Sequence, residues 1–304
     1  MNKALVTGGN GFLGHHIVRE LSNRGIEVIV YDIAKSSFMD EMSEIGPIQF
    51  IEGNILDSSK LESAMEGCDT VFHTAAIANL EDALKHPVET MEVNVMGTLH
   101  CLEAARKHKV NRFVFASSVY VSGNWGSFYR ISKQTGESLC KTYSNEFGLD
   151  FSIIRYGSLY GREANNWNFL YSVLKELLLS KQYTYYGSPD SLREYIHIND
   201  AARETINIAN NSDFRNRSVL ITGHQKMSHK EFFNMIQEIL GEKLTIIFED
   251  SDKNSHYKIT PYSFEPDIPL RINLSTYIDI NEGILDCLRE VQMEIENGKQ
   301  TKTK

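Results

Sequence analysis

The feature of this sequence that most constrains its fold is a glycine-rich stretch near the N-terminus. A short apolar run, Lys3–Thr7, leads into it, and residues 12–22 have apolar side chains at helical spacing. A second apolar run, 28–31, ends at Asp32. The order strand, glycine turn, helix, strand and acidic residue is the pattern of a dinucleotide-binding βαβ unit. The stretch therefore predicts a dinucleotide site at this turn.

The glycines of the stretch recur every third residue, at Gly8, Gly11 and Gly14. Glycine lets the backbone approach a pyrophosphate closely, and the N-terminus of the following helix favours the negative charge. Asp32 is expected to accept hydrogen bonds from both hydroxyls of an adenosine ribose and to repel a 2′-phosphate, which favours NAD over NADP. The residues expected to bind NAD here are Gly8, Asn10, Gly11, Phe12, Leu13, Gly14 and Asp32.

Strands and helices continue to alternate beyond this unit. Further strands are predicted at 48–52, 70–76, 112–117 and 150–155, and helices at 93–107 and from Tyr129 to Phe147. This alternation predicts an α/β fold with a doubly wound parallel Rossmann sheet and a smaller C-terminal α/β substrate lobe. Asn54 and Ile55 are placed to flank an adenine, and the small residues Thr74, Ala75 and Ala76 let the backbone approach a cofactor.

The domain boundaries follow from where this alternation loosens. We expect residues 1–158 to form the NAD-binding domain, with 193–223 partly returning to it. Residues 159–192 and 224–296 are expected to form the substrate lobe, and 297–304 a disordered tail. The stretch 249–275 is rich in Pro, Tyr, Ser and Asp without a clear period, which indicates an irregular segment.

A second group of residues carries the candidate chemistry. Tyr129 and Lys133 are four residues apart, so on a helix their side chains share one face. An ammonium close to a phenol favours the phenolate, which otherwise forms near about pH 10. With a serine hydroxyl, from Ser117 or Ser118 just upstream, holding a substrate oxygen, the pair can take a proton from a hydroxyl whose carbon is oxidised. His73 also lies at a strand end, and we expect it to pack there rather than to act as a base.

Composition and charge exclude several classes of function. The 304 residues carry a net charge of −9 without a basic stripe, so no nucleic-acid partner is expected. The widely separated Cys68, Cys101, Cys140 and Cys287 form no zinc pattern, which predicts no metal site and fits a reduced, cytoplasmic compartment. No apolar stretch is long enough to span a membrane, and the N-terminal residues resemble a strand rather than a secretory signal, so no membrane association is expected.

Several further stretches combine with the glycine turn and Asp32 into a larger pattern. They are His73-Thr-Ala-Ala76, Asn94-Val-Met-Gly-Thr98, Ala116-Ser-Ser118, Tyr129 with Lys133, Arg155-Tyr-Gly-Ser-Leu-Tyr-Gly161 and Arg193-Glu-Tyr-Ile-His-Ile-Asn-Asp200. To roughly Gly223, the chain resembles the extended short-chain dehydrogenases/reductases, in the branch of NAD-dependent sugar-nucleotide epimerases and dehydratases. The resemblance implies NAD in the Rossmann domain and a UDP-, GDP- or dTDP-linked sugar in the C-terminal lobe.

The resemblance also implies roles for individual residues. Tyr129 is the implied acid/base, Lys133 holds the nicotinamide ribose, and Ser118 holds the sugar hydroxyl. Asn94, Ser117 and Tyr156 are implied to lie beside the cofactor, and Ser158 and Arg193 beside the nucleotide or diphosphate of the substrate. Relatives pair two helices into a homodimer, which implies a dimer through 93–107 and 132–147 with Leu99, Leu102, Leu139 and Tyr143 as contacts.

Three departures from the family pattern concern the substrate. Val119 and Tyr120 stand where 4,6-dehydratases carry an acidic pair, so the elimination of water lacks its acid and base. Ser158 replaces an asparagine that faces the substrate phosphate in hexose 4-epimerases. The stretch between Ser118 and Tyr129, which normally helps form the sugar pocket, is much shorter than in those epimerases and contains Trp125 between glycines.

The sequence therefore predicts NAD-dependent oxidation of a nucleoside-diphosphate sugar at a ring hydroxyl, at C4. The product is a 4-keto sugar, which a 4-dehydrogenase releases and a 4-epimerase reduces from its other face. The short loop favours release and the motif set favours epimerisation. The alternatives are an NAD(H)-dependent reductase of a non-nucleotide ketone and a non-catalytic NAD-binding protein, although Tyr129 and Lys133 count against the latter.

Overall fold

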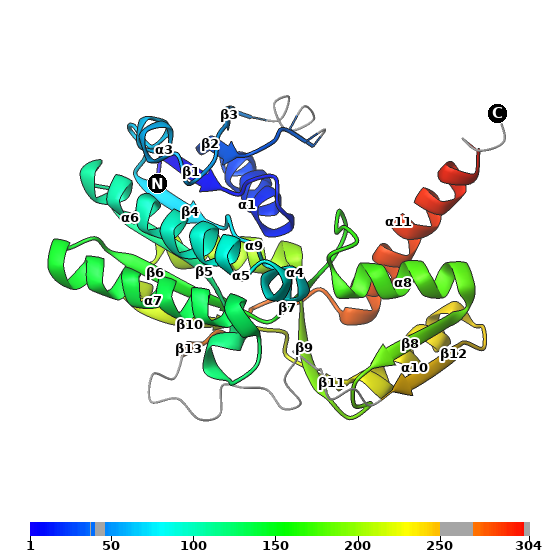
Figure 1. Cartoon of the computed structure of the whole chain (residues 1–304). Helices are drawn as coiled ribbons and strands as arrows, with labels where there is room; N and C mark the ends of the chain where they lie inside the picture. The colour runs from blue at the N-terminus through cyan, green and yellow to red at the C-terminus, as the bar shows by residue number, and fades with distance from the viewer. Residues whose placement is uncertain (37, 40–45, 250–269, 301–304) are drawn as a thin grey trace. The chain divides into compact units, whose positions relative to one another are not determined.

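The computed structural model of the chain describes residues 1–36, 38–39, 46–249 and 270–300 (Figure 1). These residues form two compact units. The first consists of Met1–Tyr156, Ala201–Ile221 and 270–272, and the second of Gly157–Asp200, 222–249 and 273–300. Most of the predicted irregular segment, 249–275, lies outside the described residues, as do the last four residues of the predicted tail.

A parallel sheet of eight strands forms the centre of the first unit. The strands are β1 (Lys3–Thr7), β2 (Glu27–Asp32), β3 (Ile48–Glu52), β4 (Thr70–His73), β5 (Arg112–Ser118), β6 (Phe151–Tyr156), β10 (Arg217–Ile221) and β13 (Leu270–Arg271). Their spatial order is β13-β10-β6-β5-β4-β1-β2-β3, so the strand order reverses between β1 and β4. The predicted doubly wound sheet is confirmed, and ligands of such sheets bind outside the carboxyl ends of the strands at this reversal.

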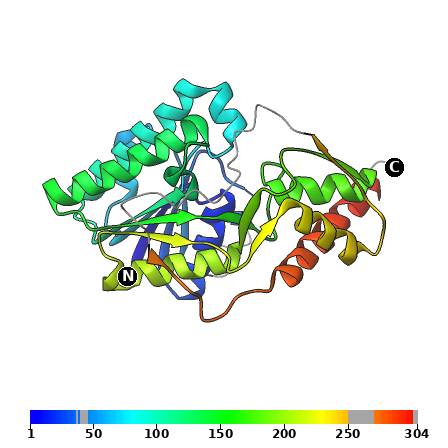
Figure 2. The same cartoon turned by 90° about the horizontal axis from the view of Figure 1, so that it is seen from below.

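Helices cover both faces of this sheet. They are α1 (Phe12–Asn23), α3 (Ser58–Ala64), α4 (Leu80–Lys85), α5 (Pro87–Met91), the π-helix η1 (Glu92–Met96), α6 (Gly97–Lys107), the 3₁₀-helix η2 (Val119–Ser122), α7 (Ser127–Phe147), α9 (Ile198–Asn210) and the 3₁₀-helix η3 (Ser212–Phe214). Figure 2 shows α6 and α7 on one face, and α1 and α9 on the other. Because both faces are covered, the central strands are buried along their whole length, as their continuous apolar runs indicate.

The core of the first unit lies between the sheet and α3, α6 and α7. Phe113 and Phe115 of β5 pack there with Cys101 and Leu102 of α6 and Cys140 of α7. The helix predicted at 93–107 begins instead as the π-helix η1, whereas α7 runs unbroken from Ser127 to Phe147. This packing holds α7, which carries Tyr129 and Lys133, against β5, which ends at Ser118.

The second unit combines short strands with three helices. It contains β7 (Ser158–Tyr160), α8 (Phe169–Ser180), β8 (Gln182–Tyr186), β9 (Leu192–His197), β11 (Lys226–Ser228), α10 (His229–Leu240), β12 (Thr245–Glu249) and α11 (Ile280–Gln300). Its strands form the sheets β11-β9-β7 and β12-β8. Residues 297–300 belong to α11, so this part of the predicted disordered tail is helical. Within the described part of the chain, no helix is both long and apolar enough to cross a membrane.

Candidate active site

The glycine turn between β1 and α1 packs tightly against the loop that follows β4. Gly8 has a φ of +69°, and a Cβ atom there would lie 2.6 Å from the backbone of Ala75. A Cβ atom on Gly14 would lie 2.1 Å from the Gly8 carbonyl oxygen, so neither position accepts a larger residue. The Thr74 hydroxyl donates to the carbonyl oxygens of Thr7, at 2.7 Å, and Gly8, at 3.2 Å. The structure thus joins the two segments that the sequence predicts to bind NAD.

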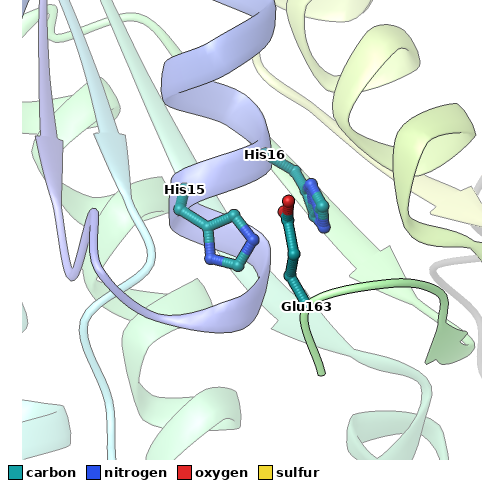
Figure 3. Close-up of side chains that lie close together, drawn as sticks. All are labelled: His15, His16 and Glu163. Carbon is teal, nitrogen blue, oxygen red and sulfur yellow. The ribbon is translucent and has the colours of Figure 1, made fainter. Parts of the chain in front are cut away.

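The N-terminus of α1 has the properties of a phosphate site. Its N-cap is Gly11, and no side chain among the described residues caps it. The first-turn N–H groups, which have no partners within a helix, therefore remain available to a pyrophosphate. The centre of the Phe12 ring lies 5.6 Å from that of the His16 ring. The His15 and His16 rings, drawn in Figure 3, have their centres 4.2 Å apart. His15 and His16 are buried and Phe12 is half-buried, so their packing helps to fix the start of the helix. Glu163, also drawn in Figure 3, belongs to the second unit.

Asp32 ends β2 beside the same turn. Its carboxylate accepts the N–H groups of Asn10, at 2.9 Å, and Ile33, at 2.7 Å. Burial raises the pKa of Asp32, and these backbone hydrogen bonds oppose the rise. The Asn10 side chain donates to the Ala34 carbonyl and accepts from the Ser36 hydroxyl at 3.1 Å, which ties the turn to the loop after β2. Since a carboxylate accepts about four hydrogen bonds, Asp32 keeps capacity for ribose hydroxyls.

We expect Asp32→Ala to reduce the preference for NAD over NADP by about tenfold or more, because the variant no longer places a negative charge against the 2′-phosphate. Calorimetric titration with both cofactors measures this preference. Glu52→Ala is the matched control, since Glu52 is the exposed register partner of Asp32 on β3 and should leave the preference unchanged. Equal affinity of the unaltered protein for both cofactors would show that Asp32 does not select the ribose.

The adenine-flanking residues predicted after β3 differ in their surroundings. Asn54 is exposed, and its side-chain oxygen accepts the Leu56 N–H at 2.9 Å. The Ile55 side chain is buried in the core, so close to α6 that a Cβ atom on Gly97 would lie 2.4 Å from it. Ile55 therefore offers its backbone rather than its side chain to a base.

Asn94 lies in the π-helix η1 and holds the loop after β4. Its side-chain oxygen accepts the Ile77 N–H at 2.7 Å, and its amide nitrogen donates to the Ile77 carbonyl at 2.9 Å and to the Ser132 hydroxyl at 3.0 Å. Both amide hydrogens are thus committed to protein groups. Asn94 consequently positions the cofactor loop against α7, and π-helical turns of this kind are frequent at functional sites.

The structure brings Ser118, Tyr129 and Lys133 together at the carboxyl end of β5. The Tyr129 hydroxyl is hydrogen-bonded to Ser118. The Lys133 ammonium, one turn further along α7, donates to the Ala116 carbonyl at 2.7 Å and lies 5.8 Å from the centre of the Tyr129 ring. Lys133 also lies 4.9 Å from the centre of the Phe115 ring, so its charge is surrounded by aromatic and backbone groups rather than by water.

Burial dominates the protonation of this pair. It raises the pKa of Tyr129 to about 12, against the lowering effect of the hydrogen bond from Ser118. It lowers the pKa of Lys133 to about 8, against the raising effects of Cys140 and Glu137. The expected phenolate is therefore not favoured in the protein alone, because burial of Tyr129 outweighs the opposing hydrogen bond from Ser118. At neutral pH Tyr129 carries its proton.

His73 has the packing role that its position at the end of β4 predicts. Its Nδ1 atom lies 2.7 Å from the Thr7 hydroxyl and its Nε2 atom 2.9 Å from the Thr98 hydroxyl. The Thr98 hydroxyl already donates to the Asn94 carbonyl at 2.6 Å, so Nε2 carries the proton and Nδ1 accepts from Thr7. Burial, together with the nearby Lys133, lowers the pKa of His73 to about 3, which keeps the ring neutral.

Two predicted cofactor residues direct their side chains elsewhere. The buried Tyr156 hydroxyl lies 2.6 Å from the Thr205 hydroxyl of α9, and burial raises its pKa. The Ser117 hydroxyl donates to the Glu137 carboxylate at 2.5 Å. Because both side chains are bound to protein groups, only the backbone of these two residues can face a cofactor.

The predicted substrate residues Ser158 and Arg193 belong to one sheet of the second unit. β7 and β9 are parallel, with Ser158 paired to Tyr195. Arg193 lies on β9 two residues before this partner of Ser158. Arg193 is buried, and its guanidinium donates to the Leu192 carbonyl at 2.9 Å. Their contact with a substrate stays a prediction.

The sequence interpretation missed one buried ion pair next to the catalytic residues. Arg155 of β6 contacts Glu137 of α7 through Nε to Oε1, at 2.9 Å, and Nη2 to Oε2, at 2.7 Å. Both side chains are almost fully buried, at 3% and 6% exposed. The signal was present, because Glu137 follows Lys133 by four residues and Arg155 is charged within an otherwise apolar strand.

Comparison with known proteins supports the same assignment. Residues 4–221 match the sequence model of the NAD dependent epimerase/dehydratase family. A putative UDP-glucose 4-epimerase of Methanocaldococcus jannaschii is 27% identical over 274 residues, which cover 84% of this chain and 88% of that protein. An uncharacterized UDP-glucose epimerase of Bacillus subtilis is 30% identical over 272 residues, 82% of this chain and 85% of that protein. The crystal structure of UDP-glucuronic acid 4-epimerase from Bacillus cereus, with UDP-glucuronic acid and NAD, has a TM-score of 0.83 at 23% identity, covering 96% of this chain and 99% of that one, and thus shares the fold.

Proposed function

Because the chain belongs to the NAD-dependent epimerase/dehydratase family, we propose that it is a nucleoside-diphosphate-sugar 4-epimerase that oxidises the C4 hydroxyl of its substrate. The observation that carries this proposal is the hydrogen-bonded pair Ser118 and Tyr129 with Lys133 one turn along α7. The cofactor is NAD, which accepts the hydride when bound. The tight turn at Gly8 and the uncapped N-terminus of α1 fit a dinucleotide.

Each catalytic residue has one task in this proposal. The positive charges of Lys133 and of bound NAD would favour the phenolate of Tyr129. The phenolate then takes the proton of the C4 hydroxyl and returns it to the carbonyl oxygen, while Ser118 orients that oxygen. Lys133 holds the nicotinamide ribose and favours loss of the Tyr129 proton. Asn94 keeps the loop after β4 in place against α7. The acidic pair of a dehydratase is replaced by Val119 and Tyr120, which argues against elimination of water.

UDP is the proposed nucleotide, because both curated relatives described above are named UDP-glucose epimerases. A 4-dehydrogenase is the second candidate, and the short loop after β5 favours it. Arg130 donates to the Gly123 carbonyl at 3.1 Å, and Gln134 donates to the Val121 carbonyl at 2.7 Å. α7 thus holds this loop close, which leaves less surface to retain a keto sugar.

Incubation with UDP-, GDP- and dTDP-sugars in the presence of NAD tests both candidates. An epimerase yields a new sugar stereoisomer by NMR without net NADH absorbance. A dehydrogenase yields NADH in proportion to the substrate, together with a keto sugar. Absence of both products with all three classes of nucleotide sugar would refute the proposed function.

We also propose a homodimer through the outer face of α4–α7. The exposed apolar residues there are Leu84, Val88, Met96, Ile131 and Phe147. They replace part of the predicted set, because Leu102 is fully buried and Tyr143 nearly so within the protomer. Light scattering at micromolar concentration should give a dimer, and Ile131→Asp should weaken it, whereas Leu179→Asp at an exposed position of α8 should not. A monomeric unaltered protein would contradict this interface.

A cytoplasmic location completes the proposal. All four cysteines are free and buried, as expected for a protein of a reducing compartment.

A further inference from the structure

The carboxyl end of β5 is attached to α7 by three consecutive residues. The Ala116 carbonyl accepts from Lys133 at 2.7 Å, the Ser117 hydroxyl donates to Glu137 at 2.5 Å, and Ser118 is hydrogen-bonded to Tyr129. The three helix residues follow one another at intervals of four, so they form one row along the buried face of α7. Glu137 thus occupies the third position of a row whose first two members carry the chemistry.

Arg155 extends this row to the neighbouring strand. Its guanidinium binds both oxygens of Glu137, and its Nη1 atom donates to the Ser122 hydroxyl at 3.3 Å. Ser122 ends the 3₁₀-helix that directly follows Ser118. A single buried ion pair therefore connects α7, both strands β5 and β6, and the segment after the catalytic serine.

The charged and titratable groups around Lys133 come from three elements. On α7 they are Tyr129, Glu137 and Cys140, and on β4 there is His73, while Arg155 of β6 lies beyond Glu137. His73 is neutral, and burial keeps the Cys140 thiol and the Tyr129 phenol protonated by raising their pKa values. Within the described residues, Glu137 is the carboxylate that raises the pKa of Lys133.

We propose that Glu137 is a positioning residue of this site, which aligns the end of β5 with Tyr129 and Lys133 on α7, with Arg155 as its counter-ion. The inference rests on the proposed function, since it takes Tyr129 and Lys133 as the pair that serves NAD and substrate. Glu137 acts through Lys133 and Ser117 and touches neither ligand itself.

Calorimetric titration with NAD from neutral to alkaline pH tests this role without a sugar substrate. In the unaltered protein, affinity should fall as the pH rises through the pKa of Lys133, because the ammonium that holds the ribose is lost. Glu137→Gln keeps the size of the side chain and a carbonyl acceptor for Ser117, but leaves the buried charge of Arg155 uncompensated. The pH at which affinity falls should then move down by about one unit. Glu146→Gln, an exposed position near the end of α7, should leave it unchanged.

Arg155→Met should shift the pH at which NAD affinity falls in the opposite direction. It leaves the Glu137 carboxylate uncompensated beside Lys133, so the pH at which NAD affinity falls should move up. A pair with only a structural role would lower the melting temperature or the overall affinity of both variants without moving this pH, and that result would overturn the proposal. If one variant does not fold, the sign of the other decides. Because no sugar is present, failure here is distinct from a failure to turn over nucleotide sugars.

Discussion

Tyr129→Phe should retain NAD binding and lose at least about a hundredfold in turnover, the usual scale for a positioned acid/base group. The phenol is the group that exchanges a proton with the C4 oxygen, and its hydrogen bond with Ser118 fixes where that exchange takes place. Phenylalanine keeps the packing of the ring but can neither give nor accept this proton. Sugar turnover under saturating substrate measures the loss, and calorimetry measures NAD binding separately.

Tyr120→Phe is the matched control for this variant. The Tyr120 ring packs edge-on against the Tyr129 ring, with 6.4 Å between the ring centres. The control variant, like Tyr129→Phe, loses one phenolic hydroxyl. Turnover of this control should stay within a few-fold of the unaltered protein. Near-normal turnover of Tyr129→Phe would show that another group moves the proton, and the assignment of the active site to α7 would fail.

The close packing of the glycine turn could be predicted from the sequence because glycine is required there. Gly8 and Gly14 lie where any Cβ atom would collide with the backbone, so the pattern of glycines itself records the geometry. The parallel sheet could be predicted because short apolar runs alternate with helical segments along the chain. Strands that are covered on both faces are apolar throughout, rather than polar at every second residue. Both signals can be recognised within short stretches of sequence, although the backbone that packs on Gly8, that of Ala75, lies far along the chain.

Side-chain direction at the site was harder to predict because it depends on neighbouring strands. Ser117 and Ser118 are adjacent, yet Ser117 reaches Glu137 while Ser118 reaches Tyr129. Arg155 is the register partner of Ser117, and both bind the same carboxylate. Strand parity then directs the next residue, Tyr156, to the opposite face and to Thr205 of α9. These directions depend on the register between β5 and β6, which cannot be predicted from either strand alone.

The protonation of Tyr129 and Lys133 could not be predicted from their spacing. Spacing identifies an ammonium near a phenol, which lowers the pKa of the phenol. Burial, which raises the pKa of Tyr129 to about 12 and lowers that of Lys133 to about 8, depends on what the rest of the chain packs around the pair. The same burial makes the neighbouring ion pair sensitive to the loss of either partner.

Arg155→Met should lower the free energy of unfolding by about 3–5 kcal/mol, because it leaves the Glu137 carboxylate buried without its counter-ion. Both partners of this pair are almost fully buried, and the guanidinium binds both carboxylate oxygens. Urea denaturation followed by circular dichroism measures the change. The comparison is valid if the free energy of unfolding depends on urea concentration with a similar slope in both proteins.

Arg215→Met is the matched control, since it removes the same side chain from an ion pair at the surface. Arg215 contacts Asp150 at 2.8 Å, but its side chain is 54% exposed. Water replaces the lost contact there, so the loss should be only about 0–1 kcal/mol. Equal losses in the two variants would show that Arg155 contributes no more than a surface pair. The proposed role of Glu137 in aligning the end of β5 with α7 would then have no energetic basis.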